Sequence, residues 1–228
     1  MARYKSSLPA IAALVLAAAL PLRSEAQTPP MLYSIDVSGG MVMTMGDFGE
    51  VADAGMTAIA GFSYMISPRL ALRAEGAVDV LAVSDASVMD DGTMATADID
   101  LRVWHGTGGL EFHLLDPTGS AMVALTAGAG VSTWDSSPFT IGRDDGETTT
   151  YAIGGSNPSF SIGARLGVNF AEHAASGVPL VSLFANGGMR VLQNDASKTV
   201  GLADAKGVSN FDSAMSMRVT AGLRINIP

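Results

Sequence analysis

The side chains most able to do chemistry in this chain are acids, arginines and histidines that recur at every second position of several segments. Glu111 and His113 form one such pair, because residues two apart lie on one face of an extended strand. A carboxylate beside an imidazole can act as an acid–base pair. The sequence places no serine or threonine beside them as a nucleophile, so we expect both residues to be polar filling and predict no catalytic site.

Two acidic motifs, Asp90-Asp91-Gly92 and Asp144-Asp145-Gly146-Glu147, bear a loose likeness to calcium-binding loops. Neither motif meets the ligand spacing of an EF-hand. Solvated turns explain the same residues, since aspartate and glycine are common turn formers. We therefore predict no dedicated metal site and no cofactor.

The elements that must position the charged side chains are alternating strands, and the C-terminal stretch 215–228 shows the pattern most clearly. Its odd positions are apolar from Met215 to Ile227, whereas its even positions carry Arg218, Arg224 and other polar residues. A period of two places these two sets on opposite faces of a strand. The pattern is typical of the closing strand of a barrel whose apolar side faces lipid.

Seven further segments alternate in the same way, so the chain is predicted to hold eight strands. They are expected at 32–45, 56–66, 69–83, 98–115, 120–133, 159–170, 178–192 and 215–228. Long and short connections take turns between them, as in outer-membrane barrels, where periplasmic turns are brief and outer loops are long. The alternation slips by one position inside 98–115, and we expect a β-bulge in the stretch 105–109, which contains His105.

The composition fits a barrel better than a soluble domain or a helical membrane protein. Hydrophobic residues make up 48% of the 228 residues. No segment after the N-terminus is apolar for the roughly 18 residues that a membrane helix needs. Charged residues are only 15%, against about 25% in soluble domains. A net charge of −9 argues against a nucleic-acid partner, and the absence of cysteine excludes disulfides and thiol catalysis.

The N-terminus is predicted to be a secretory signal peptide over residues 1–26, followed by one barrel domain over residues 27–228. Arg3 and Lys5 give the basic region, an apolar run extends from Leu8 to Leu20, and Ala26 ends a small-residue cleavage site. An N-terminal membrane anchor is the alternative, although the apolar run is short for a membrane span. The interpretation predicts export, in a bacterium with two membranes.

Aromatic residues provide a second indication of membrane insertion. If the short turns are periplasmic, several aromatic residues fall at the periplasmic ends of their strands, on the apolar face. The predicted periplasmic girdle consists of Tyr33, Phe62, Tyr64, Phe112 and Phe170.

The opposite, inward face is predicted to carry a network of charged side chains. Its expected members are Asp36, Arg73, Glu75, Asp79, Asp98, Asp100, Arg102, Glu111, Arg165, Arg190, Arg218 and Arg224. An eight-stranded barrel is just wide enough to be filled by side chains, and buried charges must pair. We expect a salt-bridged plug in which Arg224 or Arg218 pairs with Asp36. A conducting or gated pore is the alternative.

These features resemble the small eight-stranded outer-membrane barrels, the group of the OmpA transmembrane domain, OmpX and OmpW. The likeness covers residues 31–228 and includes the short turns at Ser67-Pro68 and Asp116–Gly119. It implies an all-β, eight-stranded antiparallel up-and-down transmembrane β-barrel, assembled by periplasmic chaperones and the barrel-assembly machinery. Members usually end in an aromatic residue that this machinery reads, whereas this chain ends Ile225-Asn226-Ile227-Pro228.

Four functions follow as hypotheses. The favoured one is a monomeric, non-enzymatic outer-membrane protein with a structural or surface-interaction role, in contact with outer-membrane lipid including lipopolysaccharide. Its predicted outer loops hold twelve acids against Arg143, Lys198 and Lys206, so divalent cations are candidate partners there. The alternatives are a small channel or transporter for hydrophobic compounds, an outer-membrane lipid enzyme, and a soluble periplasmic barrel of lipocalin type with inverted faces.

Overall fold

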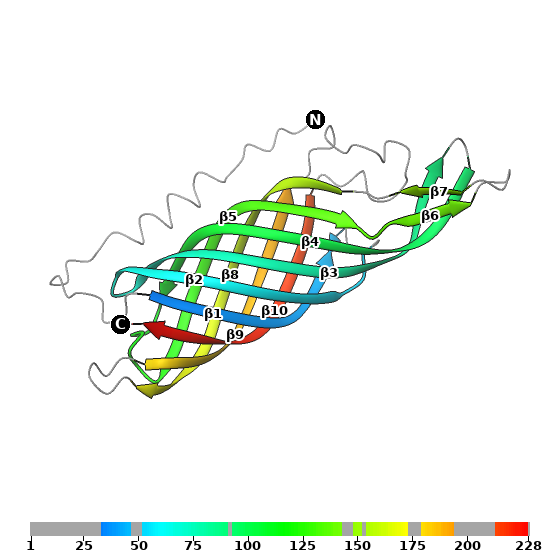
Figure 1. Cartoon of the computed structure of the whole chain (residues 1–228). Coiled ribbons are helices and arrows are strands. Elements are labelled where there is room, and N and C mark those ends of the chain that lie inside the picture. The colour runs from blue at the N-terminus through cyan, green and yellow to red at the C-terminus, as the bar shows by residue number, and fades with distance from the viewer. Residues whose placement is uncertain are drawn as a thin grey trace.

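The computed structural model describes residues 33–46, 52–90, 93–142, 148–151, 154–172, 179–193 and 213–227. Eight antiparallel strands close a barrel, which confirms the predicted all-β, eight-stranded up-and-down fold (Figure 1). Its strands are β1 (Tyr33–Met45), β2 (Gly55–Ser67), β3 (Leu70–Asp90), β4 (Thr93–His113), β5 (Ala121–Ser136), β8 (Gly154–Glu172), β9 (Pro179–Gln193) and β10 (Ser213–Ile227). Among the described residues no helix is long and apolar enough to cross a membrane.

The two ends of the chain close the barrel. β10 lies between β1 and β9, and its pairing with β1 is regular from Tyr33↔Ile227 to Met45↔Met215. Neighbours around the rest of the barrel are also neighbours in sequence, apart from a β6–β7 hairpin (Phe139–Gly142, Thr148–Tyr151) inserted between β5 and β8. Closure leaves the barrel without a free sheet edge, so each of its eight strands is paired on both sides.

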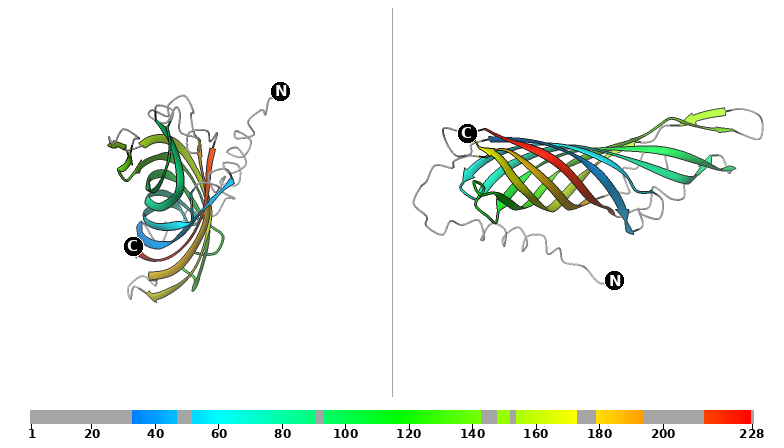
Figure 2. Two further views of the ribbon diagram at one scale, coloured as in Figure 1. Left: turned by 90° about the vertical axis from the view of Figure 1, so that its right-hand side faces the viewer. Right: turned by 90° about the horizontal axis from the view of Figure 1, so that it is seen from below.

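Two of the predicted loops are partly strand. β3 and β4 pair as far as Asp90↔Thr93, across a two-residue Asp-Gly connection of a kind that favours tight hairpins. The predicted loop 84–97 is therefore mostly an extension of this hairpin. The predicted loop 134–158 contains β6 and β7 and the ends of β5 and β8. The long hairpins extend past the other strands at one end of the barrel (Figure 2).

Side chains alternate between the two faces of the wall as the sequence pattern predicts. Along β1 and β2 the large apolar residues are exposed, for example Val37 at 57% and Met56 at 74%, while Asp36 and Thr57 are buried at 1% and 4%. The interior contains charged and hydroxyl side chains and the exterior is apolar. A soluble lipocalin-type barrel requires the reverse arrangement, so this hypothesis disagrees with the structure.

The predicted β-bulge in β4 is wrong. Pairing of β4 with β5 is unbroken from Leu101↔Ser136 to His113↔Ala124, and its pairing with β3 is regular over the same residues. Leu101 and Val103 consequently face inward and are buried, instead of outward as predicted. The alternation changes because the part of β4 around Leu101 extends beyond the ends of most other barrel strands. Polar residues replace apolar ones on its outer face there.

The short turn between β4 and β5 is stabilised by its own side chains. Thr118 donates both its backbone N–H and its hydroxyl to the Asp116 carboxylate, at 2.9 and 2.7 Å. The first of these bonds is the main reason that the pKa of Asp116 is lowered. Asn169 of β8 donates to the carbonyl oxygen of Gly119 at 2.6 Å, which attaches the turn to the neighbouring hairpin.

Candidate functional site

Five buried charged residues form the inner cluster, near the barrel end that carries the short turns. Arg73 donates two hydrogen bonds to Asp36 at 2.7 and 2.9 Å, and Arg224 donates two to Glu111, both at 2.7 Å. Arg165 lies between the carboxylates, 3.3 Å from Asp36 and 3.4 Å from Glu111. The predicted contact of Arg224 with Asp36 is present at 3.5 Å. Paired, forked hydrogen bonds of this kind are the strong form of the ion pair.

The strand register explains why these side chains meet. Asp36 and Arg224 are direct cross-strand partners, and the other partner of Asp36 is Gly61. A Cβ atom at Gly61 would lie 2.3 Å from the guanidinium of Arg73, so glycine there leaves the space in which Arg73 reaches Asp36. The guanidinium of Arg165 also stacks on the buried Phe184 ring at 4.2 Å.

A second group, the outer cluster, consists of Glu75, Asp79, Arg190 and Arg218. Arg218 donates to Asp79 at 2.6 Å, and Arg190 donates to Glu75 at 3.2 Å. Glu75 also lies 3.3 Å from Arg73, so it links the outer cluster to the inner one. Charged contacts thus continue through the lumen without an intervening apolar layer.

A hydrogen-bonded serine, histidine and aspartate adjoin the outer cluster. His105 Nδ1 lies 2.6 Å from Ser132 Oγ, and His105 Nε2 lies 2.9 Å from Asp79 Oδ2. The three residues come from the neighbouring strands β3, β4 and β5. This order of nucleophile, base and acid is the one that serine hydrolases use.

The surroundings of Ser132 do not suit acyl transfer. Ser132 has no exposed surface, and the small cavity of about 30 Å³ in this part of the lumen is lined by other residues. Hydrolysis requires room for an acyl group and hydrogen-bond donors for its oxyanion. We therefore interpret this group as internal hydrogen bonding of the wall, which fixes the orientation of His105.

Replacing His105 with leucine is expected to destabilise the barrel by about 1–3 kcal/mol, because Ser132 and Asp79 each lose a buried partner. Urea unfolding of the refolded protein measures the loss. The double variant Ser132→Ala/His105→Leu should lose less unfolding free energy than the sum of the two single variants, because both substitutions remove the same hydrogen bond. A His105→Leu protein as stable as the original chain would contradict the interpretation.

Nine of the twelve residues predicted as the lumen charge network face the interior and meet there. They are Asp36, Arg73, Glu75, Asp79, Glu111, Arg165, Arg190, Arg218 and Arg224. The predicted inward orientation of Asp100 and Arg102 is wrong, because both are exposed on the unbroken outer face of β4. Asp98 was also expected there, and its side chain lies outside the described residues.

Sequence reasoning placed His113 beside Glu111 as polar filling, but it missed the hydrogen-bonding roles of Ser63, His105 and Ser132 in the network. His113 lies 3.0 Å from Glu111, and Ser63 accepts a hydrogen bond from Arg73 at 3.2 Å. The missed role of His105 and Ser132 followed from the bulge that was expected at 105–109. His105 and Ser132 belong to the alternating sets of residues that face inward along β4 and β5. This pattern identifies them if β4 is taken as a strand without a bulge. Among the described residues no group of three or more histidines and acids is placed to hold a metal ion.

The five predicted girdle aromatics lie at the barrel end that carries the short turns. Tyr33 contacts Phe62 and Tyr64, with ring centroids 6.0 and 5.3 Å apart. Phe112 is partner of Leu70 at the start of β3, and Phe170 lies near the end of β8. All but Phe112 are more than a third exposed on the outer face, so the rings encircle part of the rim.

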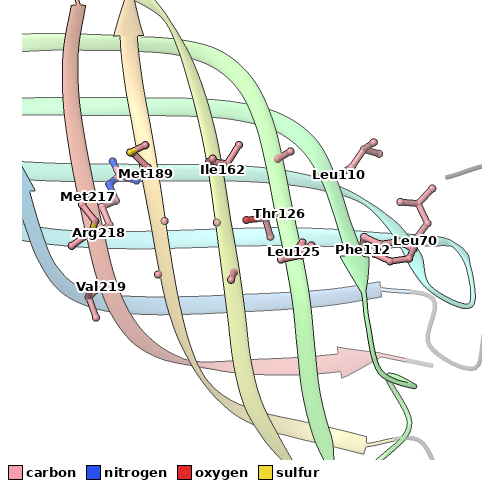
Figure 3. A pocket seen from close by; sticks show the side chains of 15 residues that line it. Leu70, Leu110, Phe112, Leu125, Thr126, Ile162, Met189, Met217, Arg218 and Val219 are labelled. Carbon is pink, nitrogen blue, oxygen red and sulfur yellow. The ribbon is translucent and has the colours of Figure 1, made fainter. Parts of the chain in front are cut away.

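The outer face also contains an apolar groove of about 650 Å³ that crosses β4, β5, β8, β9 and β10 (Figure 3). Leu125, Ile162 and Val219 line it and are 47%, 62% and 51% exposed. Small residues such as Ala164 and Gly187 form its floor. Its lining is mostly apolar, and Thr126 and Arg218 are its polar members.

Solved structures similar to this chain include several bacterial surface barrels. A major outer membrane protein of Thermus thermophilus is 12% identical, with 86% of this chain and 99% of that chain covered and a TM-score of 0.48. Neisserial surface protein A is 13% identical (86% and 97% covered, TM-score 0.47), and the Yersinia pestis attachment invasion locus protein Ail is 12% identical (86% and 100% covered, TM-score 0.41). No family model matches the chain, and no curated protein matches it significantly. These similarities assign no function.

Proposed function

We propose that this chain is an integral protein of the bacterial outer membrane, with a structural or surface-interaction role and a lumen closed by ion pairs. The observation that carries the proposal is the inverted polarity of the barrel. Large apolar side chains are exposed all around the wall, while five arginines and three carboxylates are buried inside it. Only a hydrocarbon surrounding makes such an exterior favourable, since water would be in contact with a continuous apolar surface.

The membrane location also agrees with strand length and with the aromatic rim. β1 and β2 have 13 residues each, and a tilted strand needs about 9–11 residues to cross the hydrocarbon layer. Tyrosine and phenylalanine prefer the interface between lipid and water. The end with short turns then faces the periplasm, and the long hairpins β3–β4 and β6–β7 face outward.

Support for a closed lumen comes from the contacts between its charges. Arg165 and Arg224 both contact Asp36 and Glu111, so their guanidiniums occupy the space that ions would have to cross. An eight-stranded barrel has little other interior volume. The role in the envelope is then carried by the outer face and the loops, and we propose no enzymatic activity.

The proposed partners follow from charge and location. The acidic loop segments suit divalent cations that bridge to lipopolysaccharide phosphates. A monomer inserted by chaperones and the barrel-assembly machinery is the expected form. Most of the residues concerned lie outside the described part of the chain, so these partners are proposed from the sequence.

Cell fractionation with gel electrophoresis tests the proposed location. We expect the expressed chain in the outer-membrane fraction, migrating faster unheated than boiled, as a detergent-resistant barrel does. Cleavage after Ala26 should be visible as the mature N-terminus beginning at Gln27. Recovery of the protein from the soluble periplasm, with one mobility before and after boiling, would refute the proposal.

A further inference from the structure

We propose that the lumen binds one small monovalent anion of halide size, beside Arg190 in the outer cluster. The site goes beyond the proposed function, because neither a structural role nor lumen closure requires a ligand. Its basis is the charge balance of the lumen, the unused hydrogen-bond donors of two arginines, and a cavity that these arginines line.

The described lumen has an excess of positive charge. Five inward arginines face four carboxylates, and the two inward histidines add no negative charge in any protonation state. A buried charge without a counterpart costs several kcal/mol, so an uncompensated guanidinium is unfavourable. One bound monovalent anion makes the lumen neutral.

Among the inward arginines that the structure describes, Arg190 has the most nitrogens without a hydrogen-bond partner. It is 2% exposed, and of its nitrogens Nη2 reaches Glu75, while Nε and Nη1 have no hydrogen-bond partner. Arg218, 5% exposed, uses Nη2 on Asp79 and leaves Nε unpartnered. Glu75 is already shared by Arg73, Arg190 and Arg218 at 3.3, 3.2 and 3.9 Å, so it cannot satisfy the remaining donors.

A cavity of about 30 Å³ lies where these donors meet. Arg190, Arg218, Glu75, Asn186, Thr126 and Ser161 provide its polar lining. Its space exists because Gly163 and Gly188, which are direct cross-strand partners, face inward at the same level. This volume holds one small ion or one to two water molecules. Two guanidiniums and two hydroxyls outweigh the single carboxylate of Glu75 and select an anion, whereas oxyanions larger than the cavity are excluded by size.

Two measurements on the purified mature barrel test the site. In the first, chloride replaces isethionate at constant ionic strength, and the urea midpoint of unfolding is followed. The original chain should show a saturable rise with chloride. Arg190→Gln should weaken the apparent chloride affinity about tenfold or more, because one of the two cationic groups is lost. Arg102→Gln, which removes an exposed arginine, should leave the response unchanged.

A second variant keeps the test decisive if Arg190→Gln fails to fold. Asn186→Asp supplies an internal carboxylate at the cavity, so the protein should be stable without chloride and lose the chloride response.

In the second measurement, crystals grown in bromide should show an anomalous peak beside Arg190. A cavity that contains only water, or a midpoint that does not distinguish chloride from isethionate, would overturn the proposal.

Discussion

Replacing Glu111 with glutamine is expected to destabilise the barrel by about 3–5 kcal/mol, the cost of breaking a buried ion pair by removing one partner. Glu111 has no exposed surface and lies within 3.6 Å of Arg73, Arg165 and Arg224. Glutamine keeps the shape of the side chain, but among the described residues it leaves Arg165 and Arg224 with Asp36 as their only nearby carboxylate, and Arg73 with Asp36 and Glu75. Urea unfolding in lipid vesicles, followed by tryptophan fluorescence, measures the change.

Asp100→Asn is the matched control for this prediction. Asp100 is exposed on the outer face of β4, so its neutralisation should change stability by less than about 0.5 kcal/mol. Asp36→Asn should resemble Glu111→Gln, since Asp36 contacts the same three arginines. A Glu111→Gln barrel within 1 kcal/mol of the original would show that the inner cluster does not hold the barrel together.

The second large effect concerns the outer face, where Ile162→Arg should destabilise the inserted barrel by about 2–4 kcal/mol. Ile162 is 62% exposed and lies midway along β8, at the level of the apolar groove. An arginine near the middle of the bilayer carries this cost, because its charge must be placed in hydrocarbon. The same unfolding assay in vesicles measures it.

Leu114→Arg is the control for position along the barrel axis. Leu114 is 43% exposed and lies in the short turn after β4, where a charge reaches the interface and the expected cost is about 0–1 kcal/mol. An Ile162→Arg protein that is as stable as the original, or more soluble without detergent, would mean that this face is in contact with water.

The strands and their faces could be predicted because a period of two is a local property of the sequence. Asp36 and Arg224 could also be paired in advance, since both lie near the same end of the first and last strands and closure makes these strands neighbours. The prediction of which residues face inward failed in the first half of β4, because the apolar residues there face the interior and the polar ones face outward. Leu101 and Val103 are apolar because they face inward above the charged lumen, and Asp100 and Arg102 are polar because they face water.

The contacts within the lumen could not be predicted, because they depend on register between strands that are distant in sequence. Ser132 meets His105 only because β4 and β5 pair at that position, and a one-residue shift would place Ser132 on the outer face. Likewise, Arg73 reaches Asp36 through the space at Gly61, which no spacing rule reveals. The residue types of the network were therefore accessible from the sequence, whereas its hydrogen bonds were not.

The central claim is that the charged lumen is a closed core of the barrel rather than a pathway. Planar-bilayer recording of the purified, inserted chain tests this directly, with insertion verified by heat-modifiable mobility of the same preparation. Because Arg165 and Arg224 bridge Asp36 and Glu111 across the lumen, we predict no steady current above the bilayer baseline. Regular open-channel steps from the unmodified chain would contradict the claim and favour the channel alternative.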